Sequence, residues 1–317
     1  MIVNRVSDLA SQPLFFDLDQ FISDASVFLK IEGLNVAGSI KFTTAKELIR
    51  AVKDSKVFSN HSEFIESSSG NLGVALSILC KEEGIPFSCV IDPNIAEKNR
   101  RLMEAYGTQL IQVTNQDENG GFLGSRIAEI ETRLKMNPHL IWLNQYANKA
   151  NPEAHYRKTA HEIDSCFNAI DFLFIGSGTT GTLMGCARYF REHCPNTKVI
   201  GVDALGSVTF GGKPKKRLVP GIGTSRKPLI VDESFIEKVI FVDEKDGITM
   251  CHFLLDRYGL LLGGSTGSVL QAVKQMEGEI PSGSVVVAIS PDFGEKYLDT
   301  VFNQEWICKN FYNLLRE

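Results

Sequence analysis

Three glycine-rich segments each follow a predicted strand and precede a predicted helix. They span residues 67–73, 176–185 and 263–268. The first backbone N–H groups of a helix have no partner within the helix, so such turns attract anions. In open α/β sheets these turns meet beyond the carboxyl ends of the strands, where ligands bind. The spacing therefore predicts a site for an anionic small molecule at that edge.

The middle segment, Gly176-Ser-Gly-Thr-Thr-Gly-Thr182, is the one best suited to a phosphate group. It combines unhindered backbone with the hydroxyls of Thr179, Thr180 and Thr182 at the start of a predicted helix. It lacks the Gly-Lys-Ser/Thr ending of a Walker loop. It does spell GxGxxG, and Asp203 follows about twenty residues later, as in dinucleotide-binding folds. An NAD-dependent oxidoreductase is therefore an open alternative.

Lys41 follows the turn Gly38-Ser39-Ile40 and precedes a helix that we expect to begin near Thr44. A cation at the N-terminus of a helix opposes the helix dipole, which lowers the pKa of its amine. A lysine with a lowered pKa attacks aldehydes at neutral pH and forms a Schiff base. Lys41 is therefore a candidate for covalent binding of a carbonyl group, and a solvated surface lysine is the alternative.

The elements that must position these residues alternate between short apolar runs and longer amphipathic stretches. This alternation predicts an α/β fold of doubly wound, mostly parallel sheets. The predicted strands are residues 27–31, 64–66, 87–91, 109–113, 172–175, 199–202, 239–242 and 285–289. The predicted helices include 44–52, 72–83, 97–106, 125–135 and 183–192. Residues 207–228 show neither period and predict a long loop, of a length that is commonly functional.

The composition limits the classes of partner. The chain has 317 residues, 43% of them hydrophobic, and a formal net charge of -5. This length suits one large or two coupled domains. The charge gives no reason to expect nucleic acid or an anionic membrane as a partner, so we expect small substrates. Residues 1–17 contain Arg5 and Asp8 and no uninterrupted apolar run, so we expect no signal peptide or membrane anchor, and a cytoplasmic location.

Cysteines and histidines predict neither disulfides nor a metal site. The seven cysteines are widely spaced and include no CxxC pair, and the six histidines show no HxxxH or HExxH spacing. His155 precedes Tyr156 at the opening of a helix. We interpret it as a packed or capping histidine, with a place beside the site as the alternative.

Four motifs follow one another along the chain: Lys41, Ser68-Ser-Gly-Asn-Leu-Gly73, Gly178-Thr-Thr-Gly-Thr182 and Gly264-Ser-Thr-Gly267. In this order and at these separations they resemble the fold-type II pyridoxal-phosphate enzymes, a family that includes cysteine synthase and cystathionine β-synthase. The likeness covers nearly the whole chain. It implies two doubly wound, mostly parallel-sheet domains with the cofactor between them, and a homodimer. Residues 1–41 and 148–317 would form the large cofactor domain, and 42–147 a smaller mobile substrate domain.

The resemblance also implies a role for each motif residue. Lys41 would form the internal aldimine with pyridoxal 5'-phosphate, Asn71 would hydrogen-bond the 3-hydroxyl, and Ser265 would meet the pyridine nitrogen. Ser68 and Ser69 would hold the α-carboxylate of an amino-acid substrate. The phosphate would lie in the loop of Gly178, Thr179, Thr180, Gly181 and Thr182. A serine does not keep the pyridine ring protonated, which favours β-elimination and replacement over transamination.

Within this superfamily the chain resembles the siderophore-type 2,3-diaminopropionate enzymes. The likeness rests on Val90-Ile-Asp-Pro93, Gly120-Gly-Phe-Leu-Gly-Ser-Arg126, Asn144-Gln-Tyr-Ala-Asn148, Val202-Asp-Ala-Leu-Gly-Ser-Val208, Pro220-Gly-Ile-Gly-Thr-Ser-Arg226 and Gly263-Gly-Ser-Thr-Gly-Ser268. In that branch the positions of Arg126 and Tyr146 lie near the active site. An arginine there suits a phosphorylated or dicarboxylate substrate. The alternative for Tyr146 is an aromatic side chain at a strand end.

These resemblances predict β-replacement on O-phospho-L-serine, or O-acetyl-L-serine, through an α-aminoacrylate, with Lys41 as the base for the α-proton. The amine of L-glutamate would add, giving N-(2-amino-2-carboxyethyl)-L-glutamate for 2,3-diaminopropionate biosynthesis. A cysteine synthase or cystathionine β-synthase-like enzyme that uses sulfide or a thiol is the alternative. Two departures keep it open: Phe42-Thr43 replaces the family's common Asp-Arg, and Gly178 replaces the serine of the siderophore-type enzymes. Asp292 and Glu295 resemble a stretch near the cofactor nitrogen, but we interpret them as a helix N-cap and an acidic first turn.

Overall fold

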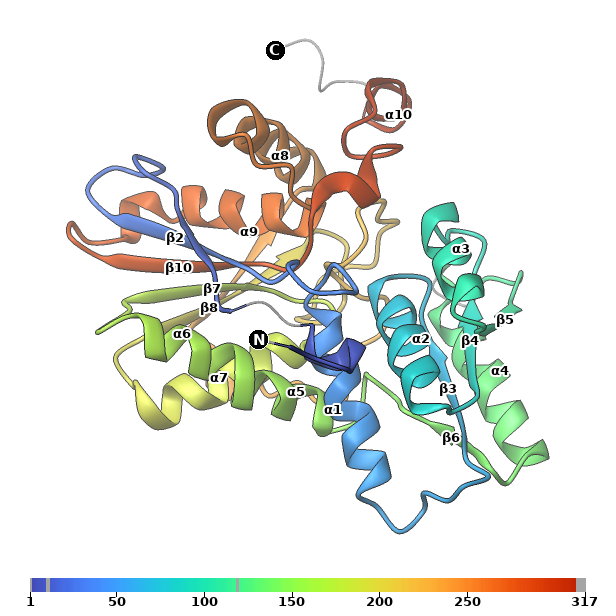
Figure 1. Ribbon diagram of the computed structural model, residues 1–317. Helices are drawn as coiled ribbons and strands as arrows, with labels where there is room; N and C mark the ends of the chain where they lie inside the picture. Colours follow the sequence, from blue (N-terminus) through green and yellow to red (C-terminus); the bar gives the residue numbers. More distant parts are fainter. Residues whose placement is uncertain (1, 10–11, 118–119, 312–317) are drawn as a thin grey trace.

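Two separate β-sheets organise the computed structural model, which describes residues 2–9, 12–117 and 120–311 (Figure 1). The larger sheet has the order β1-β2-β10-β7-β8-β9, and the smaller one β5-β4-β3-β6. Neighbouring strands are parallel except β1 and β2. The strands are β1 (Phe15–Asp17), β2 (Ser26–Ile31), β3 (Glu63–Ser67), β4 (Phe87–Ile91), β5 (Gln109–Gln112), β6 (Leu140–Trp142), β7 (Phe172–Gly176), β8 (Lys198–Ala204), β9 (Lys238–Val242) and β10 (Val285–Ser290).

Helices connect most of the parallel strands, as crossover connections require. They are α1 (Lys41–Lys53), α2 (Asn71–Glu83), α3 (Glu97–Ala105), α4 (Leu123–Met136), α5 (Ala150–Ala154), α6 (His161–Cys166), α7 (Gly181–His193), α8 (Glu244–Tyr258), α9 (Gly264–Gln275) and α10 (Gln304–Asn310). A π-helical turn, η2 (His155–Ala160), joins α5 to α6. Short 3-10 turns are η1 (Val6–Asp8), η3 (Glu233–Phe235), η4 (Glu277–Glu279) and η5 (Gly294–Tyr297).

The larger sheet is covered on both faces. In β7, Phe172 and Phe174 belong to the core on the side of α8 and α9, whereas Leu173 and Ile175 belong to the core on the side of α7. This alternation follows from the two-residue period of a strand. All four side chains are buried. Because both faces are buried, the strands have the nearly continuous apolar sequences from which they were predicted.

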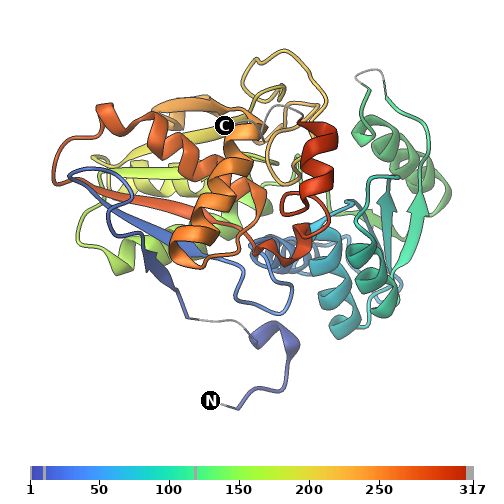
Figure 2. The ribbon, with the colours of Figure 1, turned by 90° about the horizontal axis from the view of Figure 1, so that it is seen from above.

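The smaller sheet is also packed between helices. Phe64 and Ile91 join a core with α2 and α3, while Ile65 and Val90 face Ile130 of α4. Helix α1 packs against both α2 and α5, so it lies between the two parts of the molecule. Figure 2 shows the smaller sheet and its helices to one side of the larger sheet.

The predicted α/β class is correct, and every predicted strand is present within one or two residues of its expected bounds. The short strands β1 and β6 were not predicted, since three residues are too few to show a period. Helix α1 begins at Lys41, so the expected start near Thr44 is wrong. The Phe42 N–H donates to Ser39 O, and the Ile40 N–H donates to Pro291 O at 2.8 Å, which fixes the chain in helical geometry earlier.

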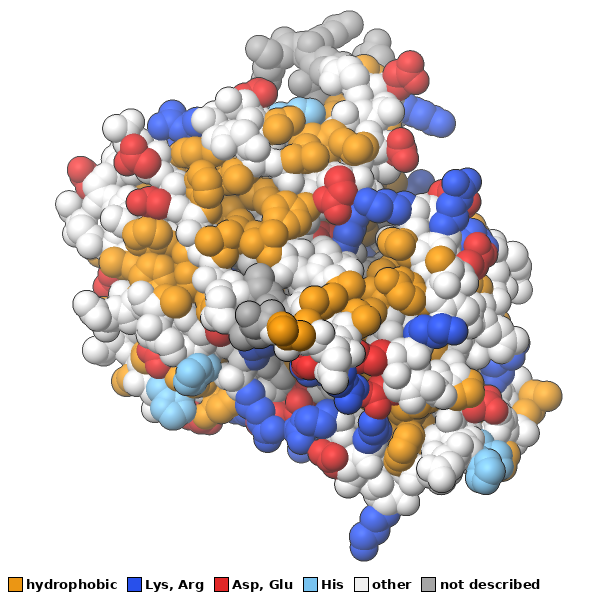
Figure 3. Space-filling model, in the orientation of Figure 1, with side chains coloured by type: hydrophobic (Ala, Val, Ile, Leu, Met, Phe, Trp, Pro, Cys, Tyr) orange, Lys and Arg blue, Asp and Glu red, His pale blue; other side chains and the backbone are white. Residues whose placement is uncertain are grey.

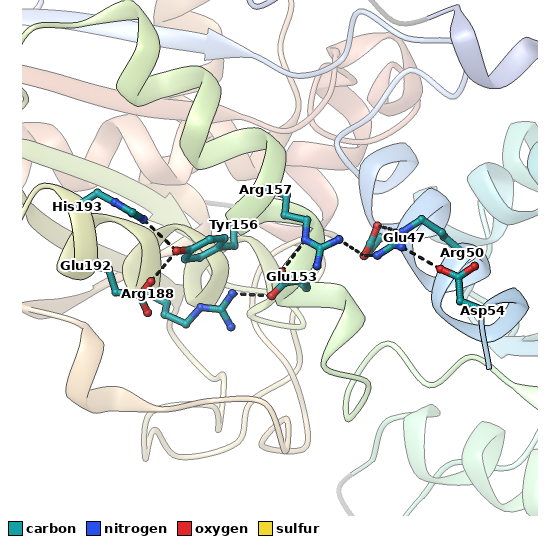
Figure 4. Close-up of polar contacts among 9 residues, drawn as sticks. All are labelled: Glu47, Arg50, Asp54, Glu153, Tyr156, Arg157, Arg188, Glu192 and His193. Carbon is teal, nitrogen blue, oxygen red and sulfur yellow. Dashed lines mark hydrogen bonds and ion pairs between the residues drawn. The ribbon is translucent and has the colours of Figure 1, made fainter. Parts of the chain in front are cut away.

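A chain of surface ion pairs connects α1 to α7 across α5 and η2 (Figure 4). Arg157 lies 2.7 Å from Glu153 and 3.7 Å from Glu47 of α1. Glu153 also pairs with Arg188 of α7 at 2.6 Å. The guanidinium of Arg188 lies over the ring of Tyr156. Helices α1 and α7 both begin at the site described below, and this chain of ion pairs links them at the surface.

The predicted long loop is confirmed, because residues 207–228 form no helix or strand. No helix within the described ranges is long and apolar enough to cross a membrane. On the face shown in Figure 3, lysine and arginine side chains are interspersed with acidic ones. The predicted domain boundaries stay a prediction, and their outer ends at residues 1 and 312–317 lie outside the described residues.

Candidate active site

Four helices, α1, α2, α7 and α9, begin at one pocket of about 470 Å³, a volume that includes open space at its mouth. The unpaired N–H groups and the dipoles of these helices favour a negatively charged ligand there. The pocket is lined by all eight residues that were predicted to hold a cofactor: Lys41, Asn71, Gly178, Thr179, Thr180, Gly181, Thr182 and Ser265. The structure thus brings together residues from four distant parts of the chain, while their individual roles stay predictions.

Lys41 is the first residue of α1, and its side chain is only partly exposed. Burial lowers the pKa of Lys41 to about 8, against the opposing effect of the Asp292 carboxylate. The helix dipole was the expected cause, whereas the cause found in the structure is removal of the amine from water. With this pKa, roughly one amine in ten is neutral at pH 7, compared with fewer than one in a thousand for an ordinary lysine.

The loop before α7 forms a concave surface that side chains larger than glycine would fill. A Cβ on Gly178 would lie 3.0 Å from Gly221 O, and one on Gly181 would overlap the Asn151 side chain. Thr180 has a φ of +66°, a left-handed conformation that a β-branched residue rarely adopts. Its Oγ1 is buried and has no hydrogen-bond partner in the described part of the chain. The loop is therefore strained, and it leaves a hydroxyl free for a ligand.

Two buried polar side chains, Asn151 and His155, make hydrogen bonds that fix this loop. Asn151 Nδ2 donates to Thr179 Oγ1 at 3.1 Å and to Gln145 O at 2.7 Å. His155 Nε2 lies 2.9 Å from Thr44 Oγ1 and 3.3 Å from Thr182 Oγ1. Burial lowers the pKa of His155 well below its usual value, so its ring is neutral. His155 is a packed histidine, as expected, but one that connects α1 to the loop.

The hydroxyls of Ser68 and Ser69, in the loop before α2, both take part in hydrogen bonds within the protein. Ser68 Oγ accepts the N–H groups of Gly73 at 3.1 Å and Gly70 at 3.3 Å, so only its hydrogen is free to donate. Ser69 Oγ donates to Asp92 Oδ2 at 2.8 Å and accepts from Arg126 Nη1 at 3.0 Å. The hydroxyl of Ser69 is therefore committed in this conformation, and its predicted contact with substrate requires this network to open.

Arg126 faces the loop before α2 from α4. Its Nη1 lies 3.1 Å from Asp92 Oδ2, while its Nε is buried without a hydrogen-bond partner in the described ranges. Tyr146 is half-buried nearby, and burial raises the pKa of its hydroxyl against the effect of Arg126. The structure therefore places Arg126 against Ser69, and the Tyr146 hydroxyl close enough to Arg126 for its pKa to be affected. Neither residue is among those that line the pocket containing Lys41. The Nε–H of Arg126 is left for an acceptor.

A buried glutamate lies beneath this loop. Glu66 accepts the N–H groups of Ser67 at 2.8 Å and Gln145 at 3.2 Å. Burial is the main reason that the pKa of Glu66 is raised to about 7. Sequence patterns gave no sign of Glu66, because it lies on a strand whose two faces are both buried.

Residues 13–292 match the family described as pyridoxal-phosphate dependent enzyme. The chain belongs to this family. The match spans most of the chain and includes the eight pocket residues named above. Tyr297, which also lines the pocket, lies beyond the matched residues. Members of the family use pyridoxal 5'-phosphate.

Solved structures of family members resemble the chain over nearly its full length. An O-ureido-L-serine synthase is 25% identical with a TM-score of 0.86, and the match covers 96% of each chain. The O-acetylserine dependent cystathionine β-synthase of Helicobacter pylori is 26% identical with a TM-score of 0.85, covering 95% of this chain and 98% of that one. The cysteine synthase of Entamoeba histolytica is 26% identical with a TM-score of 0.87, covering 95% and 90%.

The pocket residues fit pyridoxal 5'-phosphate. Lys41 offers an amine that is partly neutral near pH 7, which attachment of the aldehyde requires. The free hydroxyl of Thr180 and the N-terminus of α7, which has no side-chain cap, suit the phosphate group. Ser265 is 4% exposed and lines the same pocket. One pocket thus offers a partly neutral amine for the aldehyde of the cofactor, and a free hydroxyl with an uncapped helix N-terminus for its phosphate.

The alternative of an NAD-dependent oxidoreductase is wrong for this chain, as the family match shows. The structure gives the physical reason. Asp203, which would bind a ribose in a dinucleotide fold, is fully buried, and its Oδ1 accepts the N–H of Ala204. Burial raises the pKa of Asp203. Its carboxylate therefore holds the local backbone and is not exposed to a ligand.

The interpretation of Asp292 as a helix N-cap is wrong. The N-cap of η5 is Phe293, and Asp292 is 2% exposed in the wall of the pocket. Its Oδ2 accepts from Asn71 Nδ2 at 2.7 Å. Glu295 does lie in the first turn of η5, as expected. The sequence did contain a signal for Asp292, because residues 292–295 resemble a family stretch near the cofactor nitrogen. The interpretation as a helix N-cap was preferred over that signal.

Proposed function

We propose that this enzyme catalyses β-replacement on O-phospho-L-serine, or on O-acetyl-L-serine, with the amine of L-glutamate as the nucleophile. The product is N-(2-amino-2-carboxyethyl)-L-glutamate, a precursor for 2,3-diaminopropionate. The observation that carries the proposal is the convergence in one pocket of Lys41, the loop before α7, Ser265 and the N-terminus of α2. Serine derivatives also appear in the names of two similar solved structures, those of the O-ureido-L-serine synthase and the O-acetylserine dependent cystathionine β-synthase.

Lys41 is the base in this proposal. Its pKa of about 8 leaves a useful fraction of the amine neutral, and a neutral amine accepts the α-proton of the bound amino acid. Bound pyridoxal 5'-phosphate supplies the electron sink for this deprotonation. Ser265 is uncharged, so the pocket provides an environment suited to loss of a β-leaving group rather than to transamination.

The α-carboxylate of the substrate is assigned to the loop before α2. The hydroxyl hydrogen of Ser68 is free, and the first N–H groups of α2 point outward from the helix end. Asn71, the first residue of α2, lines the pocket beside Lys41. This arrangement supports binding of a carboxylate within reach of the amine that removes the neighbouring proton.

Arg126 is assigned to the additional negative charge, either the phosphate of the first substrate or the side-chain carboxylate of glutamate. Its unpartnered Nε and its hydrogen bond to Ser69 support this assignment. Charge-assisted hydrogen bonds from a guanidinium suit both groups. Tyr146, half-buried beside it, completes this end of the proposed substrate site.

A cysteine synthase or cystathionine β-synthase activity is the second candidate. One observation in its favour is Gly178, since ordinary sulfhydrylases have a glycine at this position of the phosphate loop. Another is that the similar solved structures include a cystathionine β-synthase and a cysteine synthase. Asp92, which lies 3.1 Å from Arg126, also offsets part of the charge that would attract a second carboxylate.

Competition between nucleophiles separates the two candidates. The purified enzyme is offered O-phospho-L-serine or O-acetyl-L-serine together with equal L-glutamate and sulfide, and the products are identified by mass spectrometry. We expect N-(2-amino-2-carboxyethyl)-L-glutamate as the main product. Cysteine as the sole product would exclude glutamate as the nucleophile.

The role of Arg126 has a matched control on the same helix. Arg126→Gln should raise KM for the anionic substrate about tenfold or more. Arg133→Gln removes an arginine that pairs with Glu129 at 2.7 Å, away from the pocket. It should leave KM unchanged. Equal effects of the two substitutions would remove Arg126 from the substrate site.

The attachment of the cofactor is tested by colour. The wild-type protein should show the visible absorption band of lysine-bound pyridoxal 5'-phosphate, and Lys41→Ala should lack it. A band of normal intensity in the variant would mean that another lysine holds the cofactor.

We also propose that residues 42–147 form a mobile substrate domain, that the enzyme is a homodimer and that it is cytoplasmic. The smaller sheet, which falls within 42–147, supports the first. The homodimer and the cytoplasmic location follow from the family resemblance and the sequence composition given above. Light scattering at several protein concentrations tests the dimer.

A further inference from the structure

The pocket contains one acidic side chain that the proposed function does not use. Asp292 is 2% exposed and lines the pocket together with Lys41 and Ser265. The Ile40 N–H donates to Pro291 O at 2.8 Å, and Ser39 and Asp292 form an isolated β-bridge. The chain segment that carries Asp292 is thus fixed directly beside the residues that precede Lys41.

The two carboxylate oxygens of Asp292 have different surroundings. Oδ2 accepts hydrogen bonds from Asn71 Nδ2 at 2.7 Å and from the Tyr297 hydroxyl at 2.5 Å. Oδ1 is buried and has no hydrogen-bond partner within the described residues. A Cβ on Gly263 would overlap Oδ1, so only glycine at that position allows the carboxylate to approach the start of α9.

Lys296 completes the arrangement on the other side of Asn71. Its Nζ donates to Asn71 Oδ1 and to Gly38 O, both at 2.8 Å. The amide of Asn71 is therefore held at both ends, by a carboxylate at nitrogen and by an ammonium at oxygen. A side chain held in this way has one orientation toward the pocket.

We propose that Asp292 is a positioning residue of this enzyme: its Oδ2 orients the amide of Asn71, and its carboxylate, which lines the same pocket as Lys41, is the charge partner of that lysine. The carboxylate stabilises the protonated amine of Lys41 while the cofactor is absent, and so sets the pH at which Lys41 becomes able to capture it. The inference rests on the same cofactor pocket as the proposed function, but not on the choice of nucleophile.

The charged groups around this pair are few. Asp292 faces Lys296, Tyr297 and Glu295 of η5, and Lys41 of α1. Burial raises the pKa of Asp292, whereas Lys296 and the hydrogen bonds to Tyr297 and Asn71 lower it. Asp292 is the residue whose charge raises the pKa of the Lys41 amine. His155 is another titratable group that interacts with Lys41, and it is neutral because burial lowers its pKa.

The test measures capture of the cofactor by the cofactor-free protein. Protein stripped of pyridoxal phosphate is mixed with free pyridoxal phosphate, and the rate at which the lysine-bound absorption band appears is followed from pH 6 to 10. Asp292→Asn should move the midpoint of this rate profile to lower pH by about one unit, since loss of a nearby opposite charge lowers the pKa of a lysine. Reaction of the free cofactor's own groups is the same in all variants and cancels in the comparison.

Glu295→Gln is the matched control. It removes the same charge three positions along the chain from Asp292, and the Glu295 side chain is 42% exposed. Its midpoint should equal that of the wild type. Asp292→Ser is a second variant for the case in which Asp292→Asn does not fold, because it removes the charge and keeps a hydroxyl that can accept from Asn71. It should give the same downward shift.

Folded Asp292 variants whose midpoints equal those of wild type and Glu295→Gln would overturn the proposal. Failure of the glutamate reaction would leave it standing, because no nucleophile takes part in this experiment. Conversely, an unchanged midpoint would leave the proposed β-replacement standing.

Discussion

The loops before α7 and α2 are built in the same way, yet their polar groups are used differently. Each follows a buried parallel strand and opens a helix at the same pocket. The loop before α7 leaves the buried Thr180 hydroxyl without a partner and keeps Thr180 in a left-handed conformation. In the loop before α2, Ser69 is bonded to Asp92 and Arg126.

This difference indicates that one loop is formed in advance for its ligand and the other is not. A strained backbone with an unused hydroxyl is maintained only if the surrounding structure imposes it, as Asn151 and His155 do here. In the loop before α2 the Ser69 hydroxyl is already paired, so it must exchange those hydrogen bonds when substrate arrives. The permanent cofactor and the transient substrate would therefore meet rigid and adaptable surfaces, respectively.

The largest expected effect comes from adding one methyl group to each loop. Gly181→Ala would place a Cβ against the Asn151 side chain, whereas Gly70→Ala would meet nothing within 4 Å. We expect Gly181→Ala to weaken cofactor binding at least about tenfold, because a shift of Asn151 disturbs the phosphate site. Gly70→Ala should change it less than about twofold. Equilibrium titration of cofactor-free protein measures both, and similar losses would refute the contrast.

The pH dependence of stability can be used to examine Glu66, the buried glutamate beneath the loop before α2. Its pKa is about 7 in the folded protein and 4.5 in an ordinary environment, so the folded state binds the proton more tightly. Stability from Glu66 is therefore present at low pH and is lost as pH rises from about 4.5 through 7.

We expect the free energy of unfolding of the wild type, relative to Glu66→Gln, to fall by about 1–3 kcal/mol across this window. Urea denaturation at pH 5 and pH 7.5 measures it. A difference that stays constant, or that grows with pH, would contradict a raised pKa.

Thr180→Gly should separate strain from binding in the loop before α7. Glycine accepts a φ of +66° without the steric cost that threonine meets, so the cofactor-free protein should become more stable by up to about 1 kcal/mol. Cofactor binding should weaken at the same time, because the free hydroxyl is lost. Thermal unfolding and cofactor titration are the two measurements. A variant that is destabilised without cofactor would show that the conformation is not strained.

The smallest effect is expected at the ion-pair chain of Figure 4. Arg157 is 56% exposed, and exposed ion pairs contribute little because water and salt screen them. Arg157→Gln should change the free energy of unfolding by less than about 0.5 kcal/mol and leave cofactor binding intact. His155→Ala, which breaks the buried connection between Thr44 and Thr182, should have the larger effect on both measurements. The reverse order would mean that the surface chain positions the two helices.

The amino-acid sequence by itself determined most of the order of elements and eight residues of the pocket wall. Strands buried on both faces have continuous apolar sequences, and helices have a 3.6-residue period, so both are visible locally. Glycine-rich turns between them mark helix N-termini. The order of Lys41 and the motifs at residues 68–73, 178–182 and 264–267 then identified a family that the comparison confirmed.

Only the tertiary structure decided which polar groups are free. Asn71 and Asp292 are 221 positions apart, and no local pattern predicts their hydrogen bond. The same holds for the contact of His155 with Thr182. It also holds for the Ser69 hydroxyl, which is hydrogen-bonded to Asp92, just after β4, and to Arg126 of α4. The pKa of Lys41 depends on burial by several elements at once. Burial and pairing are properties of the packed chain, because they depend on what surrounds a group from every side.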